Sequence, residues 1–312
     1  MAFSCMAFGM TAFADEDECE LYGHEWEDES IEKPATFKEN GYYRWMCEIC
    51  GEFGPRTTIY KIASVELAKK SYVYTGSKIK PAVIAKDSKG EEIEPCEYDV
   101  EYKNNLNPGT ATAKIEFSEY YAGKVTRTFT IVPAKMSAPI VKNASKGFSI
   151  YWKKVKGATS YQIFRKKAGS GYVKAATISD PNKRSYWDKS SDANVNGAKY
   201  TYKVRAYKGK TKVAYSATKS CYKLAQPKAP SVTNSGAGKI TVSWKKNDQA
   251  TGYKVKYVTG EKVKIKGTAK TKKVLTVTPG KTYKVYVCAY KTVGDWVCYS
   301  KYSPAKTITV TK

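Results

Sequence analysis

Apolar and polar side chains alternate with a period of two along much of the chain. In residues 280–290 one face carries Tyr283, Val285, Val287 and Ala289, and the other carries Lys284, Tyr286, Cys288 and Tyr290. This period, in residues rich in β-branched and aromatic side chains, predicts a half-buried strand. The dipeptide Pro279-Gly280 predicts the turn that precedes it.

The same pattern occurs twice, which indicates a tandem repeat. Residues 197–207 repeat residues 280–290. Upstream of each copy, one strand ends in tryptophan, at Trp152 and at Trp244, and nine residues later (152 to 161 and 244 to 253) a second strand opens with tyrosine.

This arrangement resembles the fibronectin type III domain, with Tyr200 and Tyr283 at the position of that family's tyrosine-corner residue. The resemblance implies two β-sandwich modules, at residues 134–226 and 227–312. We expect their cores to contain the following aromatic residues: Trp152, Tyr161, Tyr200, Trp244, Tyr253 and Tyr283.

A further β-rich segment precedes the repeat. Residues 63–133 contain six alternating stretches, at 64–67, 72–76, 79–84, 97–102, 111–117 and 126–132. Turn residues separate them and no helical period is present, which predicts a sandwich. The order of Tyr74-Thr-Gly76, Pro81-Ala-Val83 and Tyr98-Asp-Val-Glu-Tyr102 resembles bacterial Ig-like surface repeats. The predicted fold is therefore all-β and multidomain.

Residues 15–62 are predicted to be a separate small unit that binds zinc. Cys47-x-x-Cys50-Gly can form a tight knuckle, and Cys19 with His24, the only histidine, completes a Cys3His set for a structural zinc ion. A unit with so small a core needs such a metal to fold. A disulfide between Cys47 and Cys50, or reduced thiols, are the alternatives. No thioredoxin-like βαβ pattern supports a redox-active pair.

The same unit resembles the small zinc-ribbon-like repeats of secreted Firmicute proteins, in which His-x-Trp precedes Ala-Thr-Cys, a glycine and Cys-x-x-Cys-Gly. The matching positions are His24, Trp26, Ala35, Thr36, Gly41, Cys47, Cys50 and Gly51. Phe37 stands where the third ligand of that family is expected. The fourth ligand must then be Cys19, or it is absent.

Residues 1–14 are apolar and end in Ala12-Phe13-Ala14 before an acidic run. Small-x-small is typical of a signal-peptide cleavage site, and the apolar stretch is too short to span a bilayer. Because no basic region precedes it, we interpret it as a signal-peptide remnant. A buried N-terminal strand is the alternative. We expect a secreted, cell-surface-associated protein of a Gram-positive bacterium, without a transmembrane span.

The charge is distributed unevenly along the chain. The net charge is +25, but residues 15–62 carry 13 acids and 5 bases, and residues 63–133 carry 10 of each. Residues 134–312 carry 39 bases, 36 of them lysine, against 6 acids, so 39 − 6 = +33. Lysine suits diffuse attraction to a polyanion better than specific reading of nucleic acid. The alternative is that these lysines provide solubility and prevent edge-to-edge aggregation.

Aromatic side chains mix with lysines near the end of the chain and are candidate binding residues: Tyr286, Tyr290, Trp296, Tyr299 and Tyr302. They could stack on sugars or bind a polyanion, or they could pair across strands. Cys288 is expected on the outward face. A disulfide between Cys288 and Cys298, on consecutive strands, is open.

No catalytic constellation is present in the sequence. A Ser-His-Asp or Cys-His mechanism lacks a histidine once His24 is assigned to the cysteine cluster. Phosphate-loop and dinucleotide motifs are absent. We therefore predict a non-enzymatic, monomeric binding protein for cell-wall polymer, polysaccharide or a host surface protein. The alternatives are a structural spacer, or the accessory carbohydrate-binding part of an extracellular enzyme.

Overall fold

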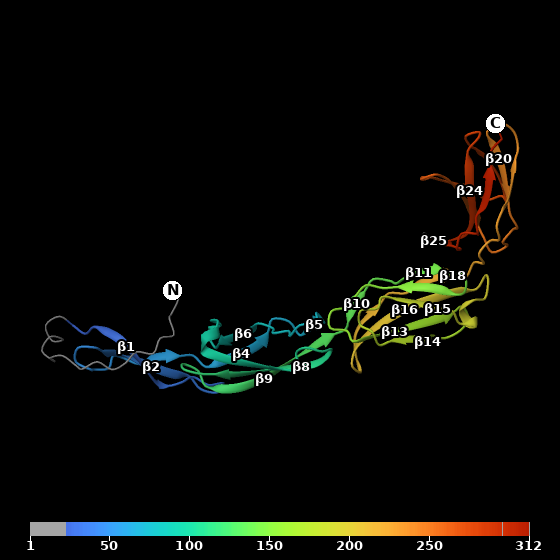
Figure 1. The fold of residues 1–312 in the computed structure, drawn as a ribbon. Coiled ribbons are helices and arrows are strands. Elements are labelled where there is room, and N and C mark those ends of the chain that lie inside the picture. Colours follow the sequence, from blue (N-terminus) through green and yellow to red (C-terminus); the bar gives the residue numbers. More distant parts are fainter. Residues whose placement is uncertain (1–22, 295, 312) are drawn as a thin grey trace. The chain divides into compact units, whose positions relative to one another are not determined.

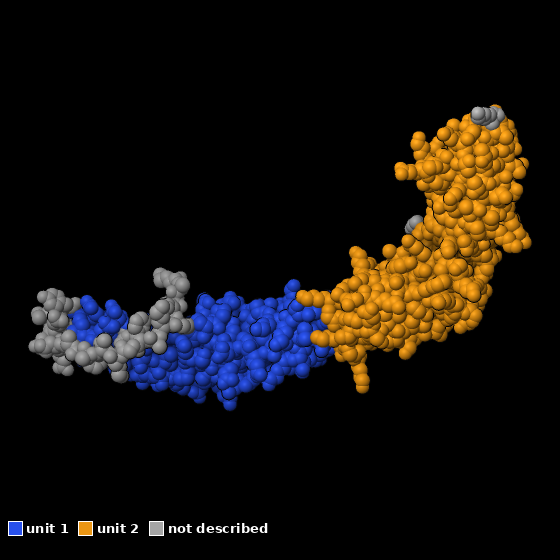
Figure 2. Space-filling view, viewed as in Figure 1, with its two compact units in different colours: residues 1–132 blue, residues 133–312 orange. Residues whose placement is uncertain are grey.

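The computed structural model describes residues 23–294 and 296–311. The residues described form strands and two short 3-10 turns, and no α-helix. The all-β prediction is confirmed. The chain divides into two compact units, residues 1–132 (unit 1) and 133–312 (unit 2) (Figures 1 and 2). The predicted signal-peptide remnant lies outside the described residues.

Unit 1 begins with an antiparallel sheet of β1 (Trp26–Lys33), β2 (Gly41–Cys47) and β3 (Thr57–Ile59). The turn between β1 and β2 leaves no room at Gly41, where a Cβ would lie 2.3 Å from the Lys33 carbonyl oxygen. The fully buried Ala35 joins this sheet to the rest of the unit. Its N–H donates to the Tyr120 carbonyl (2.8 Å), and its carbonyl accepts from Ala122 N–H (2.8 Å).

The rest of unit 1 contains two further sheets. One pairs β4 (Ile62–Leu67) with β6 (Val83–Asp87); the other has the order β5 (Ser71–Val73), β9 (Gly123–Val132), β8 (Gly109–Phe117) and β7 (Tyr98–Lys103), and the turn η1 (Pro95–Glu97) precedes β7. Their alternating faces bury Val65, Ile115, Phe129 and Ile131. The strand expected from residue 79 begins only at Val83, because Pro81 lacks the N–H that a ladder needs.

The first half of unit 2 is a two-sheet module. One sheet contains β11 (Ile140–Asn143), β12 (Phe148–Tyr151) and β15 (Ser185–Asp188). The other has the order β10 (Ala134–Met136), β17 (Thr211–Ser216), β16 (Lys199–Lys208), β13 (Ser160–Lys167) and β14 (Val173–Ile178), with β18 (Lys219–Tyr222) also pairing with β16. The turn η2 (Ser191–Ala193) follows β15.

The second half of unit 2 repeats this plan. One sheet is β19 (Ser231–Asn234), β20 (Lys239–Ser243) and β23 (Lys272–Thr276). The other has the order β22 (Lys262–Thr268), β21 (Gly252–Thr259), β24 (Thr282–Val293) and β25 (Trp296–Tyr299), with β26 (Lys306–Thr309) also pairing with β24. Val242, Val255, Val285 and Val287 are fully buried in its core.

Buried tyrosine hydroxyls hold equivalent loops in both modules. Tyr200 and Tyr283 accept the N–H of the residue five positions upstream, Val195 (3.2 Å) and Thr278 (3.1 Å). Tyr161 and Tyr253 accept the N–H six positions upstream, from Val155 (3.1 Å) and Asn247 (2.7 Å). These interactions give the loop N–H groups a hydrogen-bond partner within the same module.

In each module a tryptophan packs against one of these tyrosines. The ring centroids are 5.5 Å apart for Trp152 and Tyr161 and 5.3 Å apart for Trp244 and Tyr253. Trp152 is buried, but Trp244 is only partly buried.

The first module also contains a buried ion pair. Arg165 Nη1 donates to Asp188 Oδ2 at 2.7 Å, and Asp188 is fully buried. The Tyr202 hydroxyl donates to the same oxygen at 3.0 Å, and the Ser190 hydroxyl donates to Oδ1 at 2.9 Å. The buried Asp188 carboxylate therefore accepts hydrogen bonds from three side chains, those of Arg165, Tyr202 and Ser190.

Replacing Asp188 by alanine should leave the Arg165 charge buried and uncompensated, at a cost of about 3–5 kcal/mol. The exposed Lys246–Asp248 pair offers a matched control, and Asp248→Ala should cost less than about 1 kcal/mol. Calorimetric unfolding of the full chain compares the two variants. Equal stability of both would contradict a structural role for this ion pair.

Unit 1 buries a carboxyl group without a cationic partner. Glu97 is 8% exposed, and its Oε2 accepts from Tyr120 N–H at 3.3 Å. Burial, helped by the charges of Glu119 and Glu29, raises the pKa of Glu97 to about 7. Its protonated form is therefore favoured in the folded state.

A carboxyl whose pKa is raised on folding stabilises the fold below its unfolded pKa, and this stabilisation is lost as the pH rises through the folded pKa. The free energy of unfolding should therefore fall by about 1–3 kcal/mol between pH 4.5 and pH 7. Glu97→Gln should flatten this dependence. Melting temperatures across that range check the prediction, and an identical slope in the variant would refute it.

Candidate functional site

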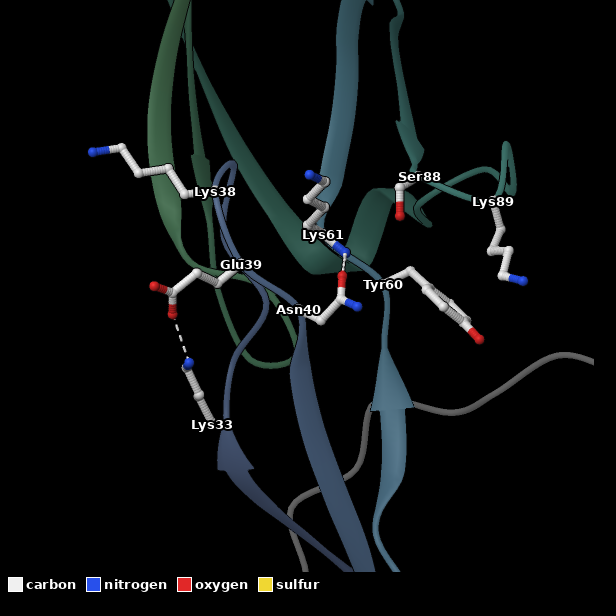
Figure 3. A pocket seen from close by; sticks show the side chains of 8 residues that line it. All are labelled: Lys33, Lys38, Glu39, Asn40, Tyr60, Lys61, Ser88 and Lys89. Atoms are coloured by element: carbon white, nitrogen blue, oxygen red, sulfur yellow. Dashed lines mark hydrogen bonds and ion pairs between the residues drawn. The ribbon is translucent and has the colours of Figure 1, made fainter.

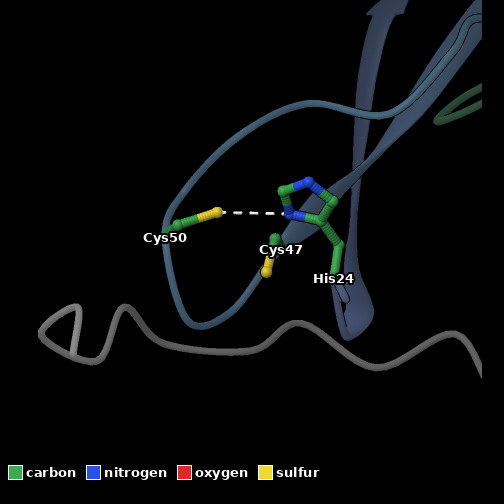
Figure 4. Close-up of side chains that lie close together, drawn as sticks. All are labelled: His24, Cys47 and Cys50. Atoms are coloured by element: carbon green, nitrogen blue, oxygen red, sulfur yellow. Dashed lines mark hydrogen bonds between the residues drawn. The ribbon is translucent and has the colours of Figure 1, made fainter. Parts of the chain in front are cut away.

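His24, Cys47 and Cys50 come together at the end of the first sheet of unit 1 (Figure 4). The register pairs Trp26 with Cys47, which brings the preceding His24 to the cysteines. Gly51, at φ 75, donates its N–H to the Cys47 carbonyl at 2.9 Å and closes the turn. This left-handed conformation favours glycine.

The geometry of the three side chains suits a zinc ion. Their ligand atoms lie within 4.8 Å of one another, and Cys50 Sγ is 3.4 Å from His24 Nδ1. Zinc bonds of about 2.3 Å to sulfur and about 2.1 Å to nitrogen give a tetrahedral edge of about 3.6 Å, close to that separation. The fourth predicted ligand, Cys19, lies outside the described residues.

The Glu52 carboxylate lies next to the ring nitrogen of His24 that faces away from Cys50. His24 Nε2 is 3.4 Å from Glu52 Oε2, and its ring lies 4.7 Å from that of Trp26. Such a carboxylate fixes the tautomer and orientation of a metal-binding histidine. The sequence search for ligands missed Glu52, although its place two residues after Cys50 could have indicated it.

The aromatic residues near the C-terminus form a lattice with lysines on the outer face of the β21–β24 sheet. Lys256 Nζ lies 4.2 Å from the ring centroid of Tyr286 and 4.6 Å from that of Tyr302. Lys254 lies 4.6 Å from the ring of Tyr299, whose hydrogen bond raises the pKa of this lysine.

The other two predicted binding residues, Tyr290 and Trp296, also make contacts within the protein. Tyr290 packs against Tyr299 at 6.0 Å, and Lys219 of the first module lies 4.6 Å from the ring of Trp296. Tyr299 is exposed, whereas Tyr286, Tyr290, Trp296 and Tyr302 are partly buried. Four of the five rings are therefore partly covered by the protein, as are Lys219, Lys254 and Lys256, and Tyr299 is the exposed member of the group.

The first module has an equivalent surface with the roles exchanged. The cross-strand partners are Phe164 and Lys203, where the second module has Lys256 and Tyr286. Lys203 lies 5.8 Å from the Phe164 ring and 3.7 Å from the Tyr172 ring, and Arg205 lies 4.5 Å from Phe164. The aromatic residue of the pair lies on β13 in the first module and on β24 in the second, and both modules contain a cation–π pair at this position.

The cysteines of the second module differ from expectation. Cys288 alternates onto the outward face, as expected, but it is only 2% exposed and its thiol donates to the Ser300 carbonyl at 3.2 Å. The segment after β25 covers it. The register places Lys291, not Cys288, opposite Cys298. Cys298 Sγ instead accepts the N–H of Tyr222, the neighbour of Cys221 in the first module, at 3.2 Å.

An open hollow of about 600 Å³ lies in unit 1 between the first sheet and the β4–β6 pair (Figure 3). Its lining is Lys33, Lys38, Glu39, Asn40, Tyr60, Lys61, Ser88 and Lys89. Lys33 is paired with Glu39 at 2.6 Å, and Lys89 lies 4.9 Å from the Tyr60 ring. These are surface groups without a buried polar anchor for a ligand.

One comparison with known protein families finds a match, over the second module of unit 2. Residues 225–305 match the family model "Fibronectin type III domain". No curated protein matches the chain. Fibronectin type III domains are typically non-catalytic binding or spacing modules, so the chain has the features of a modular binding or spacer protein.

Two solved structures of tandem domains are similar to the chain. One is chicken CNTN1 FN1–FN3, with 16% identity, a TM-score of 0.36, and coverage of 93% of this chain and 100% of that one. The other is a two-domain segment of chicken tenascin, with 20% identity, a TM-score of 0.26, and coverage of 56% and 99%. No helix in the described part of the chain has the length and apolar character needed to cross a membrane.

We predict that each chain binds one zinc ion through Cys19, His24, Cys47 and Cys50. Protein purified without a histidine tag should contain about one equivalent by metal analysis, and Cys50→Ser should reduce it severalfold because it removes a ligand. The exposed Cys96 provides the control variant Cys96→Ser, which should keep the metal. Metal-free protein with a Cys47–Cys50 disulfide would exclude the site.

Proposed function

We propose that this chain is a secreted, non-enzymatic binding protein of a bacterial cell surface, and that its tandem modules engage an anionic wall polymer. One observation carries the proposal: residues 134–312 have a net charge of +33, from 39 bases and 6 acids. Charge of one sign on this scale attracts polyanions over a Debye length.

The placement of charged groups supports this proposal. On the edge strand β22 every residue from Lys262 to Gly267 is exposed, and lysines occupy alternate positions. Asp188 and its partner Arg165 are both buried, so this pair removes one acid and one base from the surface. The remaining charged residues of 134–312 still carry the full excess, 38 − 5 = +33.

The chemistry of the cations indicates diffuse recognition. Lysine is a point charge on a flexible stem and lacks the planar fork of arginine, which reads phosphate or bases with two hydrogen bonds. The aromatic rings beneath Lys203, Lys254 and Lys256 hold those ammonium groups over the outer sheet faces. An irregular, flexible polyanion fits such a surface better than a specific nucleic acid does.

The zinc unit has a structural role in this proposal. It would stabilise the first sheet, which has a small core of its own, and it would carry no chemistry. A spacer that binds nothing remains the competing function, because a lysine-rich surface also prevents aggregation of exposed strand edges.

We expect the full chain to bind poly(glycerol phosphate), a model for teichoic acid, with an affinity that falls log-linearly as salt rises, because bound counterions are released. Replacing Lys262, Lys264 and Lys266 by glutamine should weaken binding by about tenfold. In the control variant Lys38, Lys61 and Lys89 of unit 1 are replaced by glutamine, and its affinity should equal that of the wild-type protein. Calorimetric titration at several salt concentrations measures both variants.

Two outcomes would contradict this function. Binding that does not depend on salt would point to specific contacts. No binding at low salt, together with a correctly folded protein, would leave the spacer as the better explanation.

A further inference from the structure

The two modules of unit 2 meet at a junction that contains two cysteines from distant parts of the chain. Cys221 lies on β18 of the first module, and Cys298 lies on β25 of the second. Both are buried, at 3% and 2% exposure. Strand β11 contacts both β18 and β25 and forms the third side of this junction.

Hydrogen bonds fix the strands around the thiols. The Asn143 side-chain amide donates to the carbonyl oxygens of Tyr222 (2.9 Å) and Tyr299 (3.1 Å), so one side chain joins both modules. Its oxygen accepts the N–H of Leu224 at 3.0 Å. Gln226 Nε2 donates to the Tyr302 carbonyl at 2.6 Å and adds a second bond between the modules.

The thiols themselves are in contact. The Tyr222 N–H, on the residue next to Cys221, donates to Cys298 Sγ at 3.2 Å, and Asn143 Nδ2 donates to Cys221 Sγ at 3.7 Å. The neighbouring Cys221 thiol, and then that N–H, lower the pKa of the Cys298 thiol against the opposing effect of burial. The neighbouring Cys298 thiol and burial raise the pKa of Cys221. Cys298 is therefore the stronger candidate for the attacking thiolate.

We propose that Cys221 and Cys298 form a reversible cross-link that locks the two modules together under oxidising conditions. The oxidant is a disulfide, either a small molecule or a thiol oxidoreductase. The Cys298 thiolate attacks one sulfur of this disulfide and releases one thiol. Cys221 then loses its proton, attacks the mixed disulfide and releases the second thiol. Two protein thiols are oxidised, and one disulfide is reduced to two thiols.

The cross-link would change the mechanics of the chain. The reduced junction is held by side-chain hydrogen bonds and by Lys219 and Lys291 over the rings of Trp296 and Tyr222. Such contacts can open, and burial of both sulfurs means that the oxidant enters only during opening. A disulfide would close a long loop between the modules and restrict the unfolded chain. This inference is independent of polyanion binding.

The test uses the full chain in glutathione redox buffers. Free thiols are trapped with N-ethylmaleimide in denaturant, and the protein is digested without reduction and analysed by mass spectrometry. We expect a linked pair of peptides that contain Cys221 and Cys298, lighter by two hydrogen atoms than the reduced pair. The oxidised wild-type protein should melt about 5–10 °C above the reduced protein.

Two variants and one internal standard make the result decisive. Cys288→Ser should keep the cross-link, whereas Cys221→Ser should abolish it. Cys96 is exposed and should form a mixed disulfide with glutathione, which reports that oxidation took place. The proposal is overturned if Cys298 is linked to Cys288, or if Cys221 and Cys298 are both recovered as free thiols while Cys96 is oxidised. The peptide map of the wild-type protein alone can show either outcome.

Discussion

The structure of unit 2 depends on buried tyrosine hydroxyls that accept N–H groups from their own loops. Tyr200 and Tyr283 hold the loops before β16 and β24, and Tyr161 and Tyr253 do the same for the loops before β13 and β21. Each bond fixes where a strand begins, and therefore which side chains alternate inward. The lysines on the opposite faces then point outward in both modules.

On their outer sheet faces the two modules share a lysine–aromatic pair, although the residues that form it differ. Phe164 on β13 pairs with Lys203 on β16, and Lys256 on β21 pairs with Tyr286 on β24. An aromatic ring supports the methylene stem and the ammonium group of its cross-strand neighbour in each case. The lattice therefore both stabilises the sheet and presents positive charge, and these two roles do not compete.

The period-two alternation was sufficient to predict the strands and the repeat, because burial of one sheet face is a local property of the sequence. It failed where a distant segment covers the outer face. Cys288 follows an outward alternation, yet the segment around Ser300 buries it. The contact between Cys221 and Cys298 and the ion pair of Arg165 with Asp188 also depend on tertiary packing. The closeness of Cys47 and Cys50 was predictable because knuckle spacing is local, whereas the approach of His24 to them depends on the pairing of β1 with β2.

The most direct test of the central claim, that the tandem modules carry the polyanion-binding surface, is to compare the two halves of the chain. Residues 133–312 and residues 15–132 would each be assayed for retention on purified cell wall, with and without its teichoic acid. We predict that residues 133–312 are retained only on wall that contains teichoic acid, and that residues 15–132 are not retained. Retention of residues 15–132 alone would contradict the claim.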